Sequence, residues 1–134
     1  MPFLPKPKPK ISPHRRRKTS EDRAGKRFLD SKAWKDTRKA QLGEAPYCEA
    51  CMAAGNVRGL VKNAHIDHIV PRSHGGAPLD TRNLQTLCKY HHDRKNGLEK
   101  NRGCLVEFTG SPGERLPAPG EKERLIKLLI GINA

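Results

Sequence analysis

The chain has 134 residues, of which 34% are hydrophobic and only 4% aromatic, so it suits one domain with little material for a large core. Its formal net charge of +13 favours a polyanionic partner. No apolar run approaches the length of a spanning helix, and "MPFLPKPKPK" lacks the apolar region of a secretory signal, which argues against a membrane protein and predicts a cytoplasmic one. Cytoplasmic thiols are usually reduced, so the four cysteines are expected to bind metal rather than form disulfides.

Most of the charge excess lies near the N-terminus, where residues 1–27 carry ten Lys or Arg residues and two acidic ones. Alternating Pro and Lys in "PKPKPK" favours extended chain without a hydrogen-bond ladder, so residues 1–18 are predicted to be a disordered basic tail. Such a tail is either a solvated extension or an arm that follows nucleic-acid phosphates.

Residues 19–46 are predicted to be helical. Thr19, with Asp22 three residues later, is typical of a capping box that starts a short helix. Ser31 can cap a second helix over "KAWKDTRKAQL". In this second helix Trp34 is expected to be a core anchor, with stacking on a nucleic-acid base as the alternative.

Two short clusters have the spacing of a closed zinc site. In "YCEAC" two cysteines are separated by two residues, so both thiolates can wrap one ion, although one such pair could also be a redox site. In "LCKYHH" a histidine follows a cysteine at the same interval. Cys104 is an alternative fourth ligand. The predicted structural zinc site would supply folding free energy that the small core lacks, and its ligands are Cys48, Cys51, Cys88 and His91.

Between the two halves of this site, "AHIDHIVPRSHGGAPLDTRNLQTL" predicts two strands and a loop. "HIDHIV" alternates as a short strand that Pro71 ends, and "NLQTL" gives the return strand. A helix follows from about Lys89, with Gly97 near its stop. In an ideal strand Asp67 and His68 point to opposite faces, so one site containing both needs a twisted or bulged strand, or a substrate and metal ion that lie across its edge.

The ordered set "CEAC", "IDHIVP", "GG", "NLQTLC" and "HHDRK" resembles the HNH endonucleases, particularly the small zinc-stapled members found in bacteriophages and bacteria. The resemblance covers about residues 45–97 and implies a small α+β fold, with a ββα-metal (His-Me finger) core stapled by a structural zinc and flanked by helices. It also implies an enzyme that cuts DNA with one catalytic divalent ion, Mg²⁺, Mn²⁺ or Ni²⁺. By position, Asp67 and His92 resemble ligands of that ion, His68 resembles the general base, and Asn83 resembles the middle residue of the motif.

These residue types fit the hydrolysis of a phosphodiester, which needs an activated water, a counter-charge for the phosphoryl oxygens and help for the departing alkoxide. His68 can accept the proton of the water, because the ordinary pKa of histidine is about 6.5. Asn83 is expected to fix the loop and orient His68 through hydrogen bonds. The expected products are a 5′ phosphate and a 3′ hydroxyl. Taken singly, Asp67 or Asn83 could be an ordinary turn residue, and His68 a zinc ligand or a surface histidine.

The paired histidines both could face a metal, and the two-residue gap after Cys88 assigns zinc to His91. Members of the family commonly have cysteine at the position of His91, and histidine also binds zinc. His65 is either a strand-face residue or an auxiliary phosphate contact, and His74 is expected to be exposed in its loop. Predicted phosphate contacts, which neutralise a nucleic-acid backbone without reading its sequence, are Arg72, Arg82, Arg94 and Lys95, the last at the family's "HxxK" position.

The HNH domain is predicted over residues 47–100, and residues 101–134 form a C-terminal extension. There "CLVEFTG" could be another strand, and "EKERLIKLLIGI" predicts an amphipathic helix that either packs on the core or binds a protein partner. No dimerisation signal is legible, so a monomer or weak dimer is expected, and a lone site cuts one strand per encounter. Two functions follow: a metal-dependent, weakly specific DNA endonuclease or nickase in phage DNA processing, or a non-catalytic zinc-stapled nucleic-acid-binding module.

Overall fold

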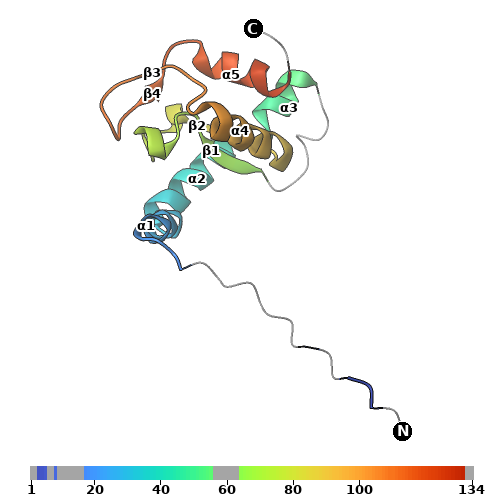
Figure 1. The fold of residues 1–134 in the computed structure, drawn as a ribbon. Helices are drawn as coiled ribbons and strands as arrows, with labels where there is room; N and C mark the ends of the chain where they lie inside the picture. The colour runs from blue at the N-terminus through green and yellow to red at the C-terminus, as the bar shows by residue number, and fades with distance from the viewer. Residues whose placement is uncertain (1–2, 6–7, 9–16, 56–63, 132–134) are drawn as a thin grey trace.

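The computed structural model describes residues 3–5, 8, 17–55 and 64–131. The predicted basic tail therefore lies largely outside the described residues. Within them, helices and short strands succeed one another (Figure 1). The elements are α1 (Ser20–Leu29), α2 (Lys32–Glu44), α3 (Glu49–Ala54), β1 (His65–His68), the short 3₁₀ turns η2 (Arg72–His74) and η3 (Thr81–Asn83), β2 (Leu84–Leu87), α4 (Lys89–Arg102), β3 (Phe108–Thr109), β4 (Leu116–Pro117) and α5 (Glu121–Leu129).

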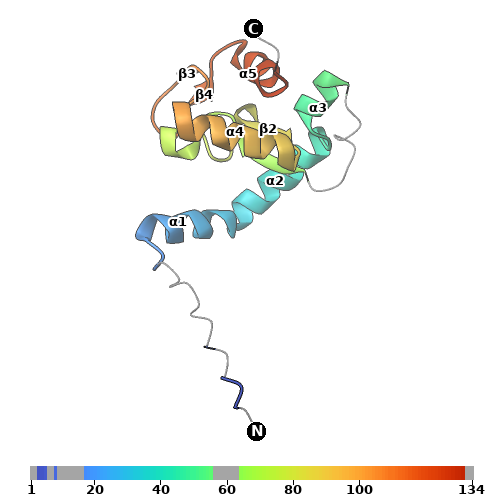
Figure 2. The ribbon, with the colours of Figure 1, turned by 45° about the vertical axis from the view of Figure 1, so that its right-hand side comes forward.

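The centre of the domain is an antiparallel hairpin of β1 and β2 that leads directly into α4. The register pairs Asp67 with Gln85 and His68 with Leu84. All four residues of β2 are buried, because α4 packs on one face of the hairpin, α2 packs on the other and α3 also contacts β2 (Figure 2). The predicted order of strand, loop, strand and helix is confirmed.

The two N-terminal helices begin where their caps predict. Thr19 Oγ1 accepts a hydrogen bond from the Asp22 amide at 3.2 Å, and the Asp22 carboxylate accepts one from the Thr19 amide at 2.9 Å. Ser31 Oγ accepts from the amide of Trp34 at 3.2 Å. Helix α1 has no buried residue and extends away from the domain, whereas α2 buries Trp34 and Gln41 beneath the hairpin (Figure 2).

Helix α4 is longer than predicted, since it continues through Gly97 and ends at Arg102. A glycine costs a helix only about 1 kcal/mol relative to alanine. The Lys95–Glu99 ion pair spans Gly97, and Leu98 packs against the core, so the helix has reasons to continue. Gly103, with a φ of 77°, follows its last turn. Strand β1 is shorter than predicted because it ends at His68, and helix α3 was not predicted.

The C-terminal extension completes the core. Leu125, Ile126 and Leu129 of α5 are buried with the zinc-site cysteines, and α5 contacts both α3 and α4. The apolar face that suggested a protein partner is therefore covered by the chain itself, and that expectation is wrong for this face. The strand expected in "CLVEFTG" is reduced to the two residues of β3. Among the described residues, no helix has the length and apolar character needed to cross a bilayer.

Candidate metal centre and active site

Four ligand atoms from separate parts of the chain converge between α3 and α4. The Nδ1 atom of His91 lies 3.4 Å from Cys48 Sγ, 3.4 Å from Cys51 Sγ and 3.3 Å from Cys88 Sγ, and all four ligand atoms lie within 4.8 Å of one another. A tetrahedral zinc ion places its sulfur and nitrogen ligands about 3.5–3.8 Å apart. The cluster therefore fits a zinc ion, and these four residues form a possible zinc-binding site.

Local structure explains why these side chains meet. Cys48 is the N-cap of α3 and Cys51 lies in its first turn, so the Cys51 amide donates to Cys48 Sγ at 3.4 Å. Cys88 is likewise the N-cap of α4, with His91 three residues later. Burial, together with the neighbouring thiols of Cys48 and Cys88, raises the pKa of the Cys51 thiol to about 12. A bound cation would reverse that effect, because a coordinating thiol is deprotonated.

Cys104 lies outside the cluster. Its thiol donates to the Val106 carbonyl at 3.3 Å, and it is not among the four converging ligands. The alternative in which Cys104 replaces His91 is therefore not supported.

The second histidine of the pair faces a different partner. His92 Nε2 lies 3.9 Å from Asp67 Oδ1, on the α4 face of the hairpin. Two ligands of one small divalent ion, each about 2.1 Å from it, are separated by about 3.0–4.2 Å. Burial lowers the pKa of His92, which favours the neutral imidazole that binds metals. A carboxylate oxygen and a neutral imidazole nitrogen at this spacing fit a divalent ion between them.

His65, whose role was open in the sequence, stacks on His92. The two ring centroids are 4.9 Å apart and the rings are nearly parallel, with 9° between their planes. Both His65 and Asp67 lie on the α4 face because they are two residues apart in β1. His65 thus restrains the ring of His92 by packing.

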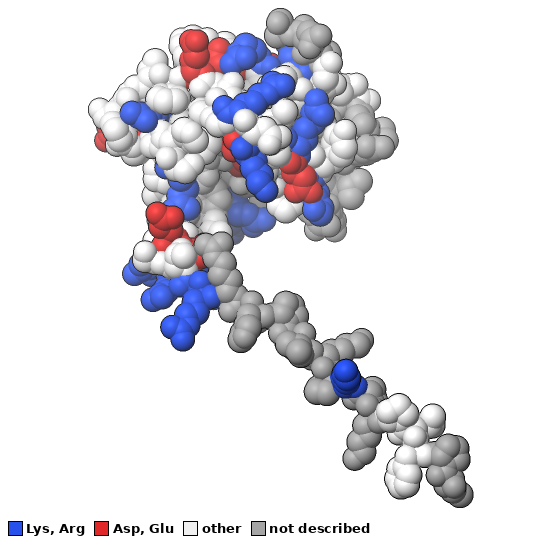
Figure 3. Space-filling view, viewed as in Figure 1, with Lys and Arg blue, Asp and Glu red and all other residues white. Residues whose placement is uncertain are grey.

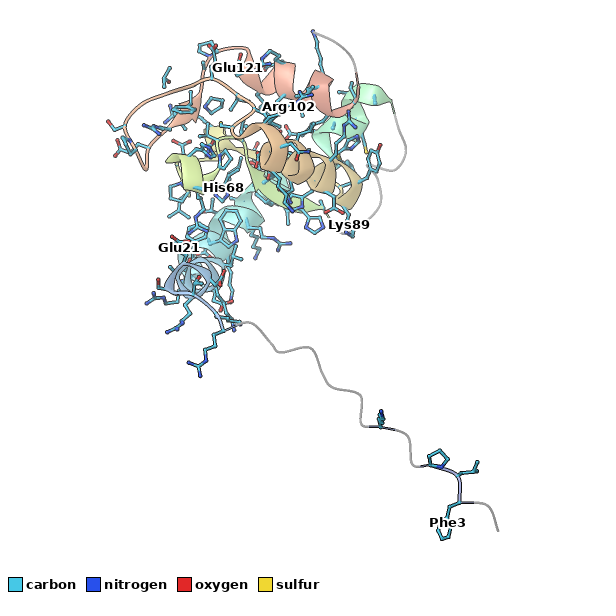
Figure 4. All side chains as sticks on the ribbon, in the orientation of Figure 1. Phe3, Glu21, His68, Lys89, Arg102 and Glu121 are labelled. Carbon is cyan, nitrogen blue, oxygen red and sulfur yellow. The ribbon has the colours of Figure 1, made fainter. Side chains whose placement is uncertain are left out.

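His68 lies on the opposite face of β1, between the hairpin and the N-terminal helices (Figure 4). Its ring stacks on Trp34 with centroids 5.0 Å apart, and Phe28 lies at 6.0 Å. Its Nε2 atom is 2.9 Å from the Pro78 carbonyl, and a carbonyl can only accept, so Nε2 carries the hydrogen. The Nδ1 atom is then the unprotonated nitrogen, which can accept a proton. Burial lowers the pKa of His68 and so favours this neutral form.

Asp67 and His68 therefore point to opposite faces, as an ideal strand requires. Asp67 contacts Gln85 and α4, whereas His68 contacts Trp34 of α2. Since His68 is the last residue of β1, both side chains flank the end of the strand. Of the arrangements considered from the sequence, a substrate lying across the edge of the strand fits this geometry.

Asn83 fastens the loop between the two strands. Its Oδ1 accepts from the Val70 amide at 2.8 Å, and its Nδ2 donates to the carbonyls of Val70 and Ala77 at 3.0 Å each. Asn83 is completely buried. The packing is so close that a Cβ atom added to Gly76 would lie 1.9 Å from the Val70 carbonyl oxygen. Asn83 and Gly76 thus fix the loop that carries Pro78, the partner of His68.

One of the four predicted phosphate contacts, Arg72, lies near His68, since both contact the Phe28 ring. The Arg72 guanidinium lies 3.7 Å from the centroid of the Phe28 ring, and burial lowers the pKa of Arg72. Arg82 pairs with Asp80 at 2.7 Å and its side chain is 74% exposed. Arg72 therefore borders the His68 site, whereas Arg82 lines a separate hollow with Pro78 and Leu116.

The other two predicted contacts are placed elsewhere. Arg94 lies two residues after His92, so it points about 200° away around the helix, and it lines a hollow with Tyr90 and Leu129. Lys95 is only 1% exposed and its ammonium contacts acceptors inside the protein. Direct contact of either residue with a phosphate at His68 does not fit these positions.

The sequence interpretation missed several residues that shape the site. Gln85 lies opposite Asp67 in the hairpin, and its Nε2 donates to Asp67 Oδ2 at 3.0 Å. Glu99 pairs with Lys95, and their spacing of four residues in a helix was a legible signal. The contact of Phe28 with His68 had no such signal, because Phe28 comes from a helix that otherwise buries nothing.

Comparison with known proteins agrees with the motif order. Residues 48–97 match the model of the family described as HNH endonuclease. Neither curated proteins nor solved structures give a match. The matched segment starts at the first zinc-site cysteine and runs through β1, β2 and the first part of α4. Residues 48–97 of the chain are therefore similar to the HNH endonuclease family.

Proposed function

We propose that the protein is a metal-dependent DNA endonuclease or nickase that hydrolyses phosphodiester bonds to 5′-phosphate and 3′-hydroxyl ends, with weak sequence specificity, in phage DNA processing. The observation that carries this proposal is the arrangement at the end of β1. There Asp67 Oδ1 and His92 Nε2 are 3.9 Å apart on one face, while His68 on the other face is hydrogen-bonded through Nε2. The HNH match supports nuclease chemistry in general.

Each residue has a chemical task in this proposal. Asp67 and His92 would hold the divalent ion, which would supply charge neutralisation for the phosphoryl oxygens and the departing oxygen. His68 accepts at Nδ1 the proton of the attacking water, while its Nε2 stays bonded to the Pro78 carbonyl. The new P–O bond forms as the bond to the 3′ oxygen breaks, the departing 3′ oxygen takes a proton from solvent water, and His68 later returns its proton to solvent. Asn83 keeps the loop in place.

The charge distribution supports nucleic acid as the substrate. The chain carries a formal net charge of +13, and basic side chains gather on α1, which extends from the domain (Figure 3). Helix α1 borders the site through Phe28, and its exposed Arg23, Lys26 and Arg27 can follow a phosphate backbone. Arg72, over the Phe28 ring, extends this basic surface beside His68.

A nicking assay tests the proposal. Wild-type protein is mixed with supercoiled plasmid and Mg²⁺, Mn²⁺ or Ni²⁺, and the relaxed and linear products are measured over time. We expect metal-dependent nicking that falls about 10²–10⁴-fold in His68→Ala, since this is the usual contribution of a general base. His74→Ala, at a half-buried histidine of the same loop, is the matched control. Absence of cleavage by wild type, or undiminished cleavage by His68→Ala, would favour the non-catalytic binding module.

A further inference from the structure

The buried lysine of α4 joins the two residues assigned to catalysis. Lys95 Nζ lies 2.9 Å from Asp67 Oδ2 and donates to the backbone carbonyl of His68 at 3.0 Å. Its remaining donor is taken by Glu99 Oε1. An ammonium has three N–H donors, so all three are occupied by protein acceptors. With 1% of its surface exposed, Lys95 has no donor left for a phosphate.

The two oxygens of the Asp67 carboxylate consequently have different partners. Oδ2 is fixed by two donors, the ammonium of Lys95 and the amide of Gln85 at 3.0 Å. Oδ1 is the oxygen that faces His92 Nε2 at 3.9 Å. Holding one oxygen fixes the plane of the carboxylate and therefore the direction of the other, as hydrogen-bonded partners do for metal ligands generally.

The surrounding charges suit the same task. Lys95 lies between Asp67 and Glu99, and the three formal charges leave one unit of net negative charge beside His92. A buried lysine with two carboxylates is compensated within the protein, whereas an unpaired one would be costly. The remaining negative charge complements a divalent cation.

We propose that Lys95 is a positioning residue, which together with Gln85 orients Asp67 towards the metal ion and ties the backbone of His68 to the same point. This inference rests on the proposed function, and it replaces the phosphate contact expected for Lys95 from the sequence. Lys95 acts through Asp67 and His68 without touching the nucleic acid.

Two variants test the inference. Lys95→Met removes the ammonium, and Gln85→Met removes the second donor to Asp67 without changing any charge. Mn²⁺ affinity is measured by calorimetry on the zinc-loaded full chain, with retained zinc as the check of folding. We expect Lys95→Met to weaken Mn²⁺ binding and to lower kcat by about 10- to 100-fold, and Gln85→Met to do so by a few-fold, with KM for DNA unchanged. Lys100→Met, at an exposed lysine of the same helix, is the control and should bind Mn²⁺ as wild type does.

DNA affinity as a function of salt, without added divalent ion, separates positioning from phosphate contact. The logarithm of the DNA association constant falls linearly with the logarithm of the salt concentration, and loss of one phosphate contact makes this fall less steep by about one. We expect no such change in Lys95→Met. The positioning role would be overturned if Lys95→Met showed a less steep dependence of DNA affinity on salt, or if it bound Mn²⁺ as tightly as wild type. If Lys95→Met fails to fold, wild-type Mn²⁺ affinity and kcat in Gln85→Met would overturn it equally. A wild-type chain that neither cleaves nor binds Mn²⁺ through His92 would overturn the proposed function and this inference together.

Discussion

The two sites on either side of α4's first turn use adjacent histidines differently. His91 belongs to a closed set in which four ligand atoms lie within 4.8 Å of one another, three of its four residues being buried. His92 belongs to a more open set, in which its Nε2 faces Asp67 Oδ1 at 3.9 Å and its Nδ1 lies 4.0 Å from Asp93 Oδ1. A structural zinc site fills its coordination with protein ligands, whereas a catalytic ion needs free positions for substrate. The difference shows how one helical turn can serve stability on one face and chemistry on the other.

The supports of the two sites differ in the same way. The zinc ligands lie at helix N-termini, where spacing of three residues brings each pair together locally. The open site depends on long-range partners, because Asp67 is held by Gln85 from β2 and Lys95 from α4. Substitutions in the zinc site should therefore unfold the chain. Substitutions in the open site should instead weaken binding of the catalytic metal and reduce cleavage.

The largest effect is expected from breaking the closed site. Cys48→Ser should remove zinc and unfold the chain, because structural zinc contributes about 10 kcal/mol or more in small domains, comparable with the whole stability of a domain. Elemental analysis and circular dichroism measure both effects. Cys104→Ser is the matched control, since its thiol lies outside the cluster. Equal zinc loss in both variants would contradict the ligand assignment.

The variant His92→Ala should separate the role of the zinc site from that of the open site. This variant should keep its zinc and its fold but lose Mn²⁺ affinity and more than about 100-fold of nicking activity, since it removes a ligand and not merely a supporting contact. Zinc content and calorimetric Mn²⁺ binding give separate readouts. Loss of zinc from His92→Ala would reverse the assignment of the two histidines.

Asn83→Ala should produce a smaller, mainly structural effect. The variant leaves the Val70 amide and the carbonyls of Val70 and Ala77 without their buried partner. We expect a loss of about 2 kcal/mol in the free energy of unfolding, measured by urea denaturation, together with weaker cleavage because the loop also holds His68. Asn96→Ala, at an exposed position of α4, should change neither quantity.

The smallest predicted effect concerns pH. Burial lowers the pKa of His68 below 6.5, so the neutral base persists to lower pH than an exposed histidine would allow, and cleavage should decline only below that value. Phe28→Ala removes part of this burial and should raise the pKa of His68, and with it the acid midpoint of kcat/KM. Leu29→Ala, at a neighbour that is 53% exposed, serves as control. A downward shift in Phe28→Ala would contradict this account of the pKa.

The sequence predicted features that depend on local spacing. Cysteine and histidine intervals of three residues correspond to one helical turn, and this geometry brings Cys48 to Cys51 and Cys88 to His91. The order of strand, loop, strand and helix followed from alternation and from Pro71. The capping residues Thr19 and Ser31 marked their helix starts correctly, because a cap is a local hydrogen bond.

Features that depend on distant partners were not predictable. Lysine is almost never fully buried, so a basic residue beside a proposed DNA site is naturally interpreted as a phosphate contact. The burial of Lys95 depends on acceptors from β1 and from the next turn of α4. Likewise, Gly97 alone disfavours a helix. Helix α4 continues past it because Lys95 pairs with Glu99 and Leu98 packs against the core. The role of Gln85 required the register of the hairpin.

Trp34 gives the molecule a built-in optical reporter. It is the only tryptophan of the chain, and its ring lies 5.0 Å from that of His68 at an interplanar angle of 25°. Protonated imidazole quenches indole emission more strongly than neutral imidazole does. The intrinsic fluorescence of the unlabelled protein should therefore follow the protonation of this one histidine, without any substitution near the site.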